Sequence, residues 1–209
     1  MWWCATLLPV SSGPASAYDC ILLAAGPSTR MRRAKQLEPV CGTPLFLYAL
    51  RTALQSCFRV VVVEGAVPLS PYLPVDDRVV VVRNEHYRRG QLGSLQVGLR
   101  ERRTPGAFIM LADLPLVKPP TYDLIAEAVQ PTGPAAAAYP AHAGRRGHPV
   151  WIGAAAVELL LSAPPDRRAM EVIATVGPRE VEVEDEGIYL DADTPEALAA
   201  LAERVRRRD

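Results

Sequence analysis

The sequence predicts an α/β protein of three layers, α/β/α, built on an open and mostly parallel sheet. Four short runs of apolar, β-branched residues recur along the chain with few polar interruptions. Stretches with apolar residues at helical spacing lie between and after these runs. The 209 residues are enough for one such domain with a sizeable core.

The expected strands are continuous apolar runs, which indicate burial on both faces, as in a parallel sheet covered by helices. They span residues 20–26, 58–65, 78–84 and 107–113. A small-residue strand is expected within 131–140, and 143–151 resembles a loop that enters another strand. Prolines mark the loop boundaries of this less regular half.

Four helices are expected between and after these strands, at residues 43–56, 91–102, 119–129 and 194–207. Thr43 followed by Pro44 predicts a helix N-cap with a proline in the first turn. Thr194 followed by Pro195 predicts the same arrangement for the last helix. The resulting order of strands and helices fits a doubly wound sheet.

Charge and composition exclude several classes of protein. The 23 Lys and Arg residues balance the 23 Asp and Glu residues, so no global field recruits nucleic acid or an anionic membrane surface. No stretch approaches the roughly 20 unbroken apolar residues of a membrane span. The four cysteines form no C-x-x-C pair and are too few for a disulfide scaffold. We therefore expect a reduced, cytoplasmic protein with neither nucleic acid nor membrane as a partner.

Residues 1–17 are set apart from the expected single domain, residues 18–209. Ala15-Ser16-Ala17 resembles a signal-peptidase site, but no Lys or Arg precedes the apolar stretch, and Pro9 interrupts it. We interpret this segment as a disordered leader or as a start placed too far upstream.

The segment LLAAGPSTRMRRAKQL, residues 22–37, carries the clearest chemical signal. An expected strand ends at Ala24-Ala25-Gly26, where small residues let the backbone approach a ligand and bind anions through its N–H groups. Arg30 and Lys35 can add positive charge against a polyphosphate. Neither a Walker A loop nor a dinucleotide fingerprint is present. From these residues alone, a basic surface loop with solvated arginines is an equally good interpretation.

Acidic residues at two places suit a metal ion. Asp113 follows an expected strand, at the carboxyl end where open α/β sheets bind ligands. Mg²⁺ takes carboxylate oxygens together with phosphate oxygens and water. Asp191 and Asp193 offer a second carboxylate, and we favour Asp193 because it lies just before the helix cap. Taken alone, Asp113 is also compatible with a strand-end turn, and Asp193 with a carboxylate favoured by the helix dipole.

Six motifs along residues 20–200 resemble, in order, those of the MobA-like nucleotidyltransferases, most closely the molybdenum cofactor cytidylyltransferases. The first is L-A-A-G-x-S-x-R-M-x-x-x-K-x-L, with Ala-Ala-Gly where guanylyltransferase relatives commonly have Ala-Gly-Gly. The others are Gly42-Thr43-Pro44-Leu45, the N…G…S-L-x-x-G-L pattern within 84–99, Leu111-Ala112-Asp113-Leu114-Pro115, Arg146-Gly147-His148-Pro149 and Asp191-Ala192-Asp193-Thr194-Pro195-Glu196. One departure is Arg32, which stands where the family usually has glycine.

The resemblance implies a Rossmann-like sheet of the nucleotide-diphospho-sugar transferase type and a Mg²⁺-dependent transfer of CMP from CTP to a molybdopterin-type acceptor, with release of pyrophosphate. It implies catalytic roles for Arg30, Lys35 and Asp113. The implied metal ligands are Asp113, Asp193 and Asp191. The implied nucleotide-binding residues are Leu23, Ala24, Ala25, Gly26, Ser28, Asn84, Gly90 and Ser94. His148 is placed near the acceptor, although a lone histidine before proline is more often structural.

Two other functions stay open. Another phosphorylated acceptor, such as a sugar 1-phosphate, would use the same chemistry, with acceptor choice made within residues 131–152. A non-catalytic accessory protein would instead bind the nucleotide or cofactor and hand it to a molybdenum hydroxylase. Lys35, Asp113 and Asp193 are all present, which favours the enzyme.

Overall fold

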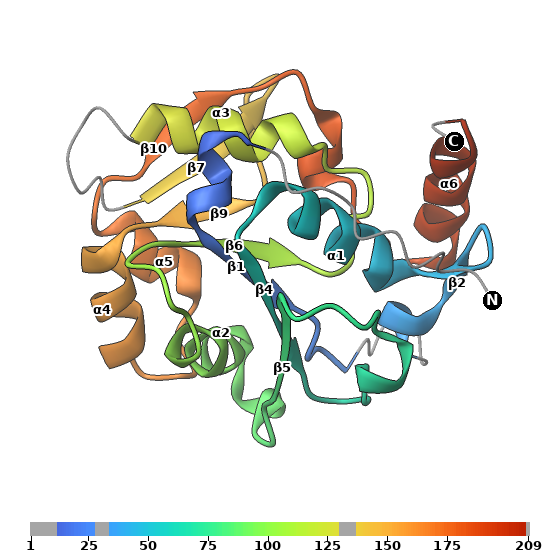
Figure 1. The fold of residues 1–209 in the computed structure, drawn as a ribbon, viewed down its shortest axis with the longest axis horizontal. Helices are drawn as coiled ribbons and strands as arrows, with labels where there is room; N and C mark the ends of the chain where they lie inside the picture. Colours follow the sequence, from blue (N-terminus) through green and yellow to red (C-terminus); the bar gives the residue numbers. More distant parts are fainter. Residues whose placement is uncertain (1–11, 28–33, 130–136, 208–209) are drawn as a thin grey trace.

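The computed structural model describes residues 12–27, 34–129 and 137–207. In this part of the chain an eight-stranded sheet lies between two layers of helices (Figure 1). Its strands are β1 (Asp19–Leu23), β4 (Arg59–Glu64), β5 (Val79–Arg83), β6 (Ala107–Leu111), β7 (Ala137–His142), β8 (Arg145–Arg146), β9 (Val150–Ile152) and β10 (Arg179–Glu182). The strand order is β10-β7-β9-β6-β1-β4-β5, and β8 pairs with β7 beside this path. The predicted three-layer α/β fold is confirmed.

The sheet is mostly parallel around its centre. β5, β4, β1 and β6 run parallel to one another, whereas β9 lies antiparallel between β6 and β7. The chain adds β4 and β5 on one side of β1 and then crosses to place β6 on the other side, which makes a topological switch point at β1. Leu23 pairs with Leu111, so β1 and β6 end at the same level and the loops that follow them lie side by side.

Two hydrophobic cores cover the two faces of the sheet. On one face, α1 (Leu45–Ser56) and α3 (Pro119–Val129) pack against the side chains of Cys20, Leu22 and their neighbours. On the other face, α2 (Gln91–Arg100), α4 (Ala154–Ser162) and α5 (Ala169–Ala174) pack against Ile21, Leu23 and their neighbours. All five residues of β1 are buried, as expected for a strand covered on both faces.

A third, smaller core lies beside the sheet. There α6 (Pro195–Arg206) packs against the hairpin formed by β2 (Pro39–Val40) and β3 (Thr43–Pro44) (Figure 1). The buried residues of this core are Val40, Leu45, Leu116, Ala192, Leu201 and Val205. At the start of α6, the Thr194 hydroxyl accepts a hydrogen bond from the Ala197 N–H at 3.2 Å, so the predicted N-cap is confirmed.

The structure differs from the predicted elements at two places. The N-cap predicted at Thr43 is wrong, because Thr43 pairs with Val40 in the β2–β3 hairpin and α1 begins only at Leu45. Helices α4 and α5 were not predicted, because α4 is apolar on nearly all sides and α5 has only six residues, so neither shows an amphipathic pattern.

Part of the predicted leader is described by the structure. The 3₁₀ helix η1 (Pro14–Ala17) packs against α3, with Ala15 fully buried. Residues 1–11 of the predicted leader lie outside the described residues.

None of the helices in the described ranges is long and apolar enough to cross a membrane.

Candidate functional site

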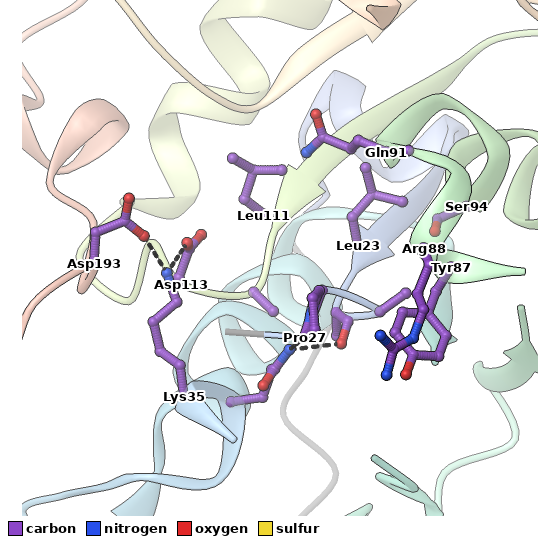
Figure 2. A pocket seen from close by; sticks show the side chains of 16 residues that line it. Leu23, Pro27, Lys35, Tyr87, Arg88, Gln91, Ser94, Leu111, Asp113 and Asp193 are labelled. Atoms are coloured by element: carbon purple, nitrogen blue, oxygen red, sulfur yellow. Dashed lines mark hydrogen bonds and ion pairs between the residues drawn. The ribbon is translucent and has the colours of Figure 1, made fainter. Parts of the chain in front are cut away.

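A pocket of about 540 Å³ opens at the switch point, beyond the carboxyl ends of β1 and β6. It is lined by Leu23–Pro27, Lys35, Gln36, Tyr87, Arg88, Gly90, Gln91, Ser94, Leu111–Asp113 and Asp193. Figure 2 shows Lys35, Asp113 and Asp193 together on one side, with Tyr87, Arg88, Gln91 and Ser94 on the other. Sites in open α/β sheets occupy this position, and the volume suits a small polyphosphate ligand.

The loop after β1 offers hydrogen-bond donors to this pocket. Four successive carbonyl oxygens of this segment accept hydrogen bonds from the protein. Those of Leu23 and Ala25 accept from the backbone N–H groups of Ala112 at 3.1 Å and Ala66 at 3.2 Å, respectively. Those of Ala24 and Gly26 both accept from Gln36 Nε2, at 3.0 Å and 2.7 Å. Within the described residues, the N–H groups of Ala25 and Gly26 make no hydrogen bond. The loop therefore presents donors without competing acceptors, as anion-binding loops do.

Lys35 joins the two acidic segments predicted to meet here. It lies in the 3₁₀ helix η2 (Lys35–Leu37), and its Nζ is 2.6 Å from Asp113 Oδ2 and 2.5 Å from Asp193 Oδ1. The Lys35 side chain is only 11% exposed, against 23% for Asp113 and 37% for Asp193. Asp113 and Asp193 follow Lys35 by 78 and 158 positions in the sequence, and the fold brings both to its ammonium group.

The two carboxylates decide the charge of Lys35. Burial disfavours the ammonium form, but the charge of Asp113 and the hydrogen bonds to Asp113 and Asp193 outweigh it and raise the pKa of Lys35 above its ordinary value. Lys35 therefore stays positively charged at neutral pH, which is the state that can bind phosphate oxygens.

Asp191 and His148 lie near the pocket but do not line it. Asp191 is exposed, and partial burial together with the charges of Asp193 and Asp113 raises the pKa of its carboxyl group. The backbone N–H of His148 donates to the Ile188 carbonyl at 2.9 Å. Burial lowers the pKa of the His148 ring to about 4, against the opposing charge of Asp113, so the ring is neutral at pH 7.

The segment between β5 and α2 forms the opposite wall of the pocket. Asn84 is buried, and its amide is used inside this segment: Nδ2 donates to Ser94 Oγ at 2.9 Å, and Oδ1 accepts from the His86 N–H at 2.9 Å. Asn84 does not line the pocket, whereas Ser94 and Gly90 do; the nucleotide-binding role that the resemblance implies for Asn84 stays a prediction. Asn84 therefore shapes the wall from behind.

Gly90 is constrained by its backbone and by the loop that packs on it. Its φ of +129° and ψ of 165° lie in a region that is almost restricted to glycine. A Cβ at this position would lie 3.1 Å from the Pro165 carbonyl oxygen. Glycine is therefore needed at this position even before any ligand approaches the wall.

We expect Gly90→Ala to lower the free energy of unfolding by about 1–3 kcal/mol, because alanine pays for the strained backbone and for the contact with Pro165. Denaturant unfolding measures this change. Gly42→Ala is a matched control, since Gly42 also has a positive φ of +82° but a Cβ there meets nothing within 4 Å. Gly90→Ala is expected to lower the free energy of unfolding more than Gly42→Ala does, because only Gly90 has Pro165 beside it. An equal or smaller loss in Gly90→Ala would contradict this expectation.

Some predicted site residues lie outside the described part of the chain, and some residues of the pocket were not predicted. Ser28, Arg30 and Arg32 lie outside the described residues, as does part of the strand expected within 131–140. Four further residues line the pocket, although no role was predicted for their side chains: Gln36, Tyr87, Arg88 and Gln91. The signal for Tyr87 and Arg88 was an arginine-rich turn before a helix, and the Arg88 guanidinium lies 5.5 Å from the centre of the Tyr87 ring.

The metal-binding capacity of the pocket rests on two carboxylates. Across the described ranges, no group of three or more His, Cys, Asp or Glu side chains is arranged to hold a metal ion. Asp113 and Asp193 share one cation, the Lys35 ammonium. Two carboxylates fit Mg²⁺, which is usually held by one or two carboxylates and completed by substrate phosphates and water.

Known proteins resemble this chain over most of its length. The profile of the family described as the MobA-like NTP transferase domain matches residues 20–183. The molybdenum cofactor cytidylyltransferase of Escherichia coli K12 is 27% identical over 193 residues, which cover 90% of this chain and 97% of that protein.

Solved structures of similar fold also align over most of this chain. The crystal structure of Rv0371c from Mycobacterium tuberculosis H37Rv has a TM-score of 0.78 and 28% identity, over 90% of this chain and 98% of that one. The crystal structure of Rv0371c in complex with manganese has a TM-score of 0.70 and 27% identity, over 89% of this chain and 98% of that one.

Proposed function

The chain belongs to the MobA-like NTP transferase family and is a nucleotidyltransferase, and from this premise we propose that it transfers CMP from CTP to a molybdopterin-type acceptor. The proposed reaction depends on Mg²⁺ and releases pyrophosphate. The observation that carries the proposal is the presence, in one pocket, of a donor-rich loop and of the group formed by Lys35, Asp113 and Asp193. The name of the Escherichia coli relative supports the choice of nucleotide and acceptor.

The proposed chemistry needs positioning and charge neutralisation more than proton transfer. A phosphate oxygen of the acceptor, already anionic near neutral pH, forms a bond to the α-phosphorus of the triphosphate. The bond from that phosphorus to the bridging oxygen breaks, and pyrophosphate leaves with the electron pair. Lys35 stabilises the negative charge on the phosphate oxygens, and Arg30 is proposed to add a second positive charge.

Asp113 and Asp193 are the residues proposed to hold Mg²⁺. When bound, the ion would neutralise phosphate charge and so ease both attack and departure. The two carboxylates are on the pocket wall and share a cation already, which shows that their oxygens can approach one positive centre. The manganese complex of Rv0371c supports a divalent ion in a protein of similar structure.

The backbone donors of the loop support CTP as the nucleotide. The pairing edge of cytosine carries one donor, the N4 amino group, and two adjacent acceptors, the ring N3 and O2, whereas that of guanine carries one acceptor and two donors. The N–H groups of Ala25 and Gly26 can donate to the two acceptors of cytosine, whereas guanine offers this pair of donors a single acceptor, and each carbonyl oxygen of the loop already accepts one hydrogen bond from the protein. A polar site rejects a ligand that leaves its groups unpaired. The resemblance at Ala24-Ala25-Gly26 leads to the same choice.

The test is pyrophosphate release from each of the four nucleoside triphosphates, with Mg²⁺ and a panel of acceptors. The panel contains molybdopterin-type cofactor and several sugar 1-phosphates. We expect release with CTP and the molybdopterin-type acceptor, abolished when Mg²⁺ is chelated. Release only with a sugar 1-phosphate would reassign the acceptor, and no release with any pair would refute the proposed reaction.

We further propose that the dinucleotide product passes to a molybdenum hydroxylase. This step concerns binding rather than chemistry, so it is tested apart from turnover. Co-purification of the product-loaded protein with a hydroxylase, lost when the product is omitted, is the expected result.

A further inference from the structure

Gln36 is a buried amide that holds the loop after β1. It follows Lys35 in η2 and is 6% exposed. Its Nε2 donates two hydrogen bonds, to the Ala24 carbonyl at 3.0 Å and to the Gly26 carbonyl at 2.7 Å. One short helical turn therefore carries both the ammonium that joins Asp113 to Asp193 and the amide that holds the loop.

The hydrogen bond to Ala24 sets the direction of a donor. In a trans peptide unit the C=O and N–H bonds point in opposite directions. Because Gln36 holds the Ala24 oxygen, the N–H of Ala25 in the same peptide unit is directed away from Gln36. Ala25 lines the pocket, and in the described part of the chain its N–H makes no hydrogen bond.

The next peptide unit is held in the same way by a different group. The Ala66 N–H donates to the Ala25 carbonyl at 3.2 Å, which fixes the direction of the Gly26 N–H. The third carbonyl, that of Gly26, again accepts a hydrogen bond from Gln36 Nε2. The nitrogen of this peptide unit belongs to Pro27 and carries no hydrogen. Three successive carbonyls are thus held, and two N–H groups are left for a ligand.

We propose that Gln36 is a positioning residue for nucleotide binding: it fixes the Ala24–Ala25 peptide so that the Ala25 N–H is offered to the nucleotide. This inference rests on the proposed function, because it assigns the nucleotide to this loop. Without the amide, the Ala24 and Gly26 carbonyls lose their donor. The Ala24–Ala25 peptide is then free to turn and present an oxygen, which repels the negative phosphates or the acceptor edge of the base.

The chain contains a close structural match to Gln36 for use as a control. Gln96, in α2, is also 6% exposed, and its Nε2 also donates to two backbone carbonyls, Leu160 at 2.8 Å and Ala163 at 2.7 Å. It joins α2 to the end of α4 and does not line the pocket. Gln36→Met and Gln96→Met each remove the two hydrogen bonds that Nε2 donates to backbone carbonyls, while keeping the side-chain length.

The experiment compares KM, kcat and Tm of the two variants with the full-length wild-type chain, using CTP and the acceptor that supports turnover. Both variants are expected to have a lower Tm. Only Gln36→Met is expected to raise the KM for CTP, by about tenfold or more, with kcat changed less than about threefold, since an interaction made equally in ground and transition states is lost. Gln96→Met is expected to keep KM within about twofold of wild type.

Equal KM changes in the two variants, or a Gln36→Met variant with wild-type KM, would overturn the inference. If Gln36→Met fails to fold, Gln36→Glu is measured in its place at pH 8. The carboxylate of glutamate has nearly the shape of the glutamine amide, but it accepts hydrogen bonds and cannot donate them. A wild-type KM for CTP in this variant would also overturn the inference. If the wild-type chain turns over no nucleotide, the proposed function fails. The shift in Tm that CTP produces in each variant then tests Gln36 by itself.

Discussion

Asp113→Ala is expected to slow Mg²⁺-dependent pyrophosphate release by roughly 10³-fold while the protein stays folded. The substitution removes one of the two carboxylates proposed to hold Mg²⁺, and this carboxylate also forms an ion pair with Lys35. The Asp113 side chain is partly exposed and follows the end of β6, so its loss leaves the core intact. Steady-state pyrophosphate release measures the effect, and circular dichroism checks the fold.

Asp77→Ala is the control for Asp113→Ala. Asp77 is an exposed carboxylate that does not line the pocket. We expect the activity of this variant to stay within about threefold of wild type, as for a surface substitution away from the reacting groups. An equal loss of activity in Asp77→Ala and Asp113→Ala would contradict a specific role of Asp113. A carrier protein would show no turnover in any form, and Asp113→Ala would keep its binding to the partner.

Lys35→Met is expected to have two opposite effects. Turnover should fall by roughly 10²–10³-fold, because a preorganised positive charge beside the phosphates is lost. Binding of Mn²⁺ without nucleotide should become tighter, because the ammonium that lies between Asp113 and Asp193 and competes with a metal ion for their oxygens is gone. Pyrophosphate release and a Mn²⁺ titration followed by electron paramagnetic resonance measure the two effects.

Lys118→Met provides the control, since Lys118 is the other lysine of the chain. Its Nζ donates to the Glu184 carbonyl at an exposed position. Both turnover and Mn²⁺ binding should be unchanged in this variant. If Lys35→Met bound Mn²⁺ no more tightly than Lys118→Met did, the ammonium would not compete with a metal ion for Asp113 and Asp193.

The parts of the fold that could be predicted are those determined by local pattern. Continuous apolar runs located β1, β4 and β6, whose side chains are buried on both faces. The same pattern located β5, although this strand lies at the edge of the sheet and its residues are only partly buried. The cap at Thr194 is local as well, since its partner is three residues away. The Thr43 prediction failed because Thr43 pairs with Val40 in a hairpin that packs on α6, a contact with a segment about 150 residues further along the chain.

The residues of the candidate site that could be predicted from the sequence are charged residues close to the end of a strand or the start of a helix. Lys35, Asp113 and Asp193 were singled out by residue type and by position near strand or helix ends. Gln36 was not, because a buried amide that satisfies backbone carbonyls has no periodic pattern and looks like an ordinary polar residue. Asn84 was predicted to bind the nucleotide, and the sequence could not show that its amide also bonds to Ser94 Oγ and to the His86 N–H within the protein.

The two carboxylates that bind Lys35 come from two parts of the fold, one with a large hydrophobic core and one with a small core. Asp113 follows β6 of the main sheet, whereas Asp193 precedes α6, which belongs to the small third core. Proteins open locally in cooperative units, and units with few buried apolar contacts open at the lowest free energy. Detachment of α6 alone would carry Asp193 away from Lys35 while the sheet and the loop after β1 stay folded. We therefore expect heating to inactivate the enzyme by undocking of α6, at a temperature below that at which the whole domain unfolds.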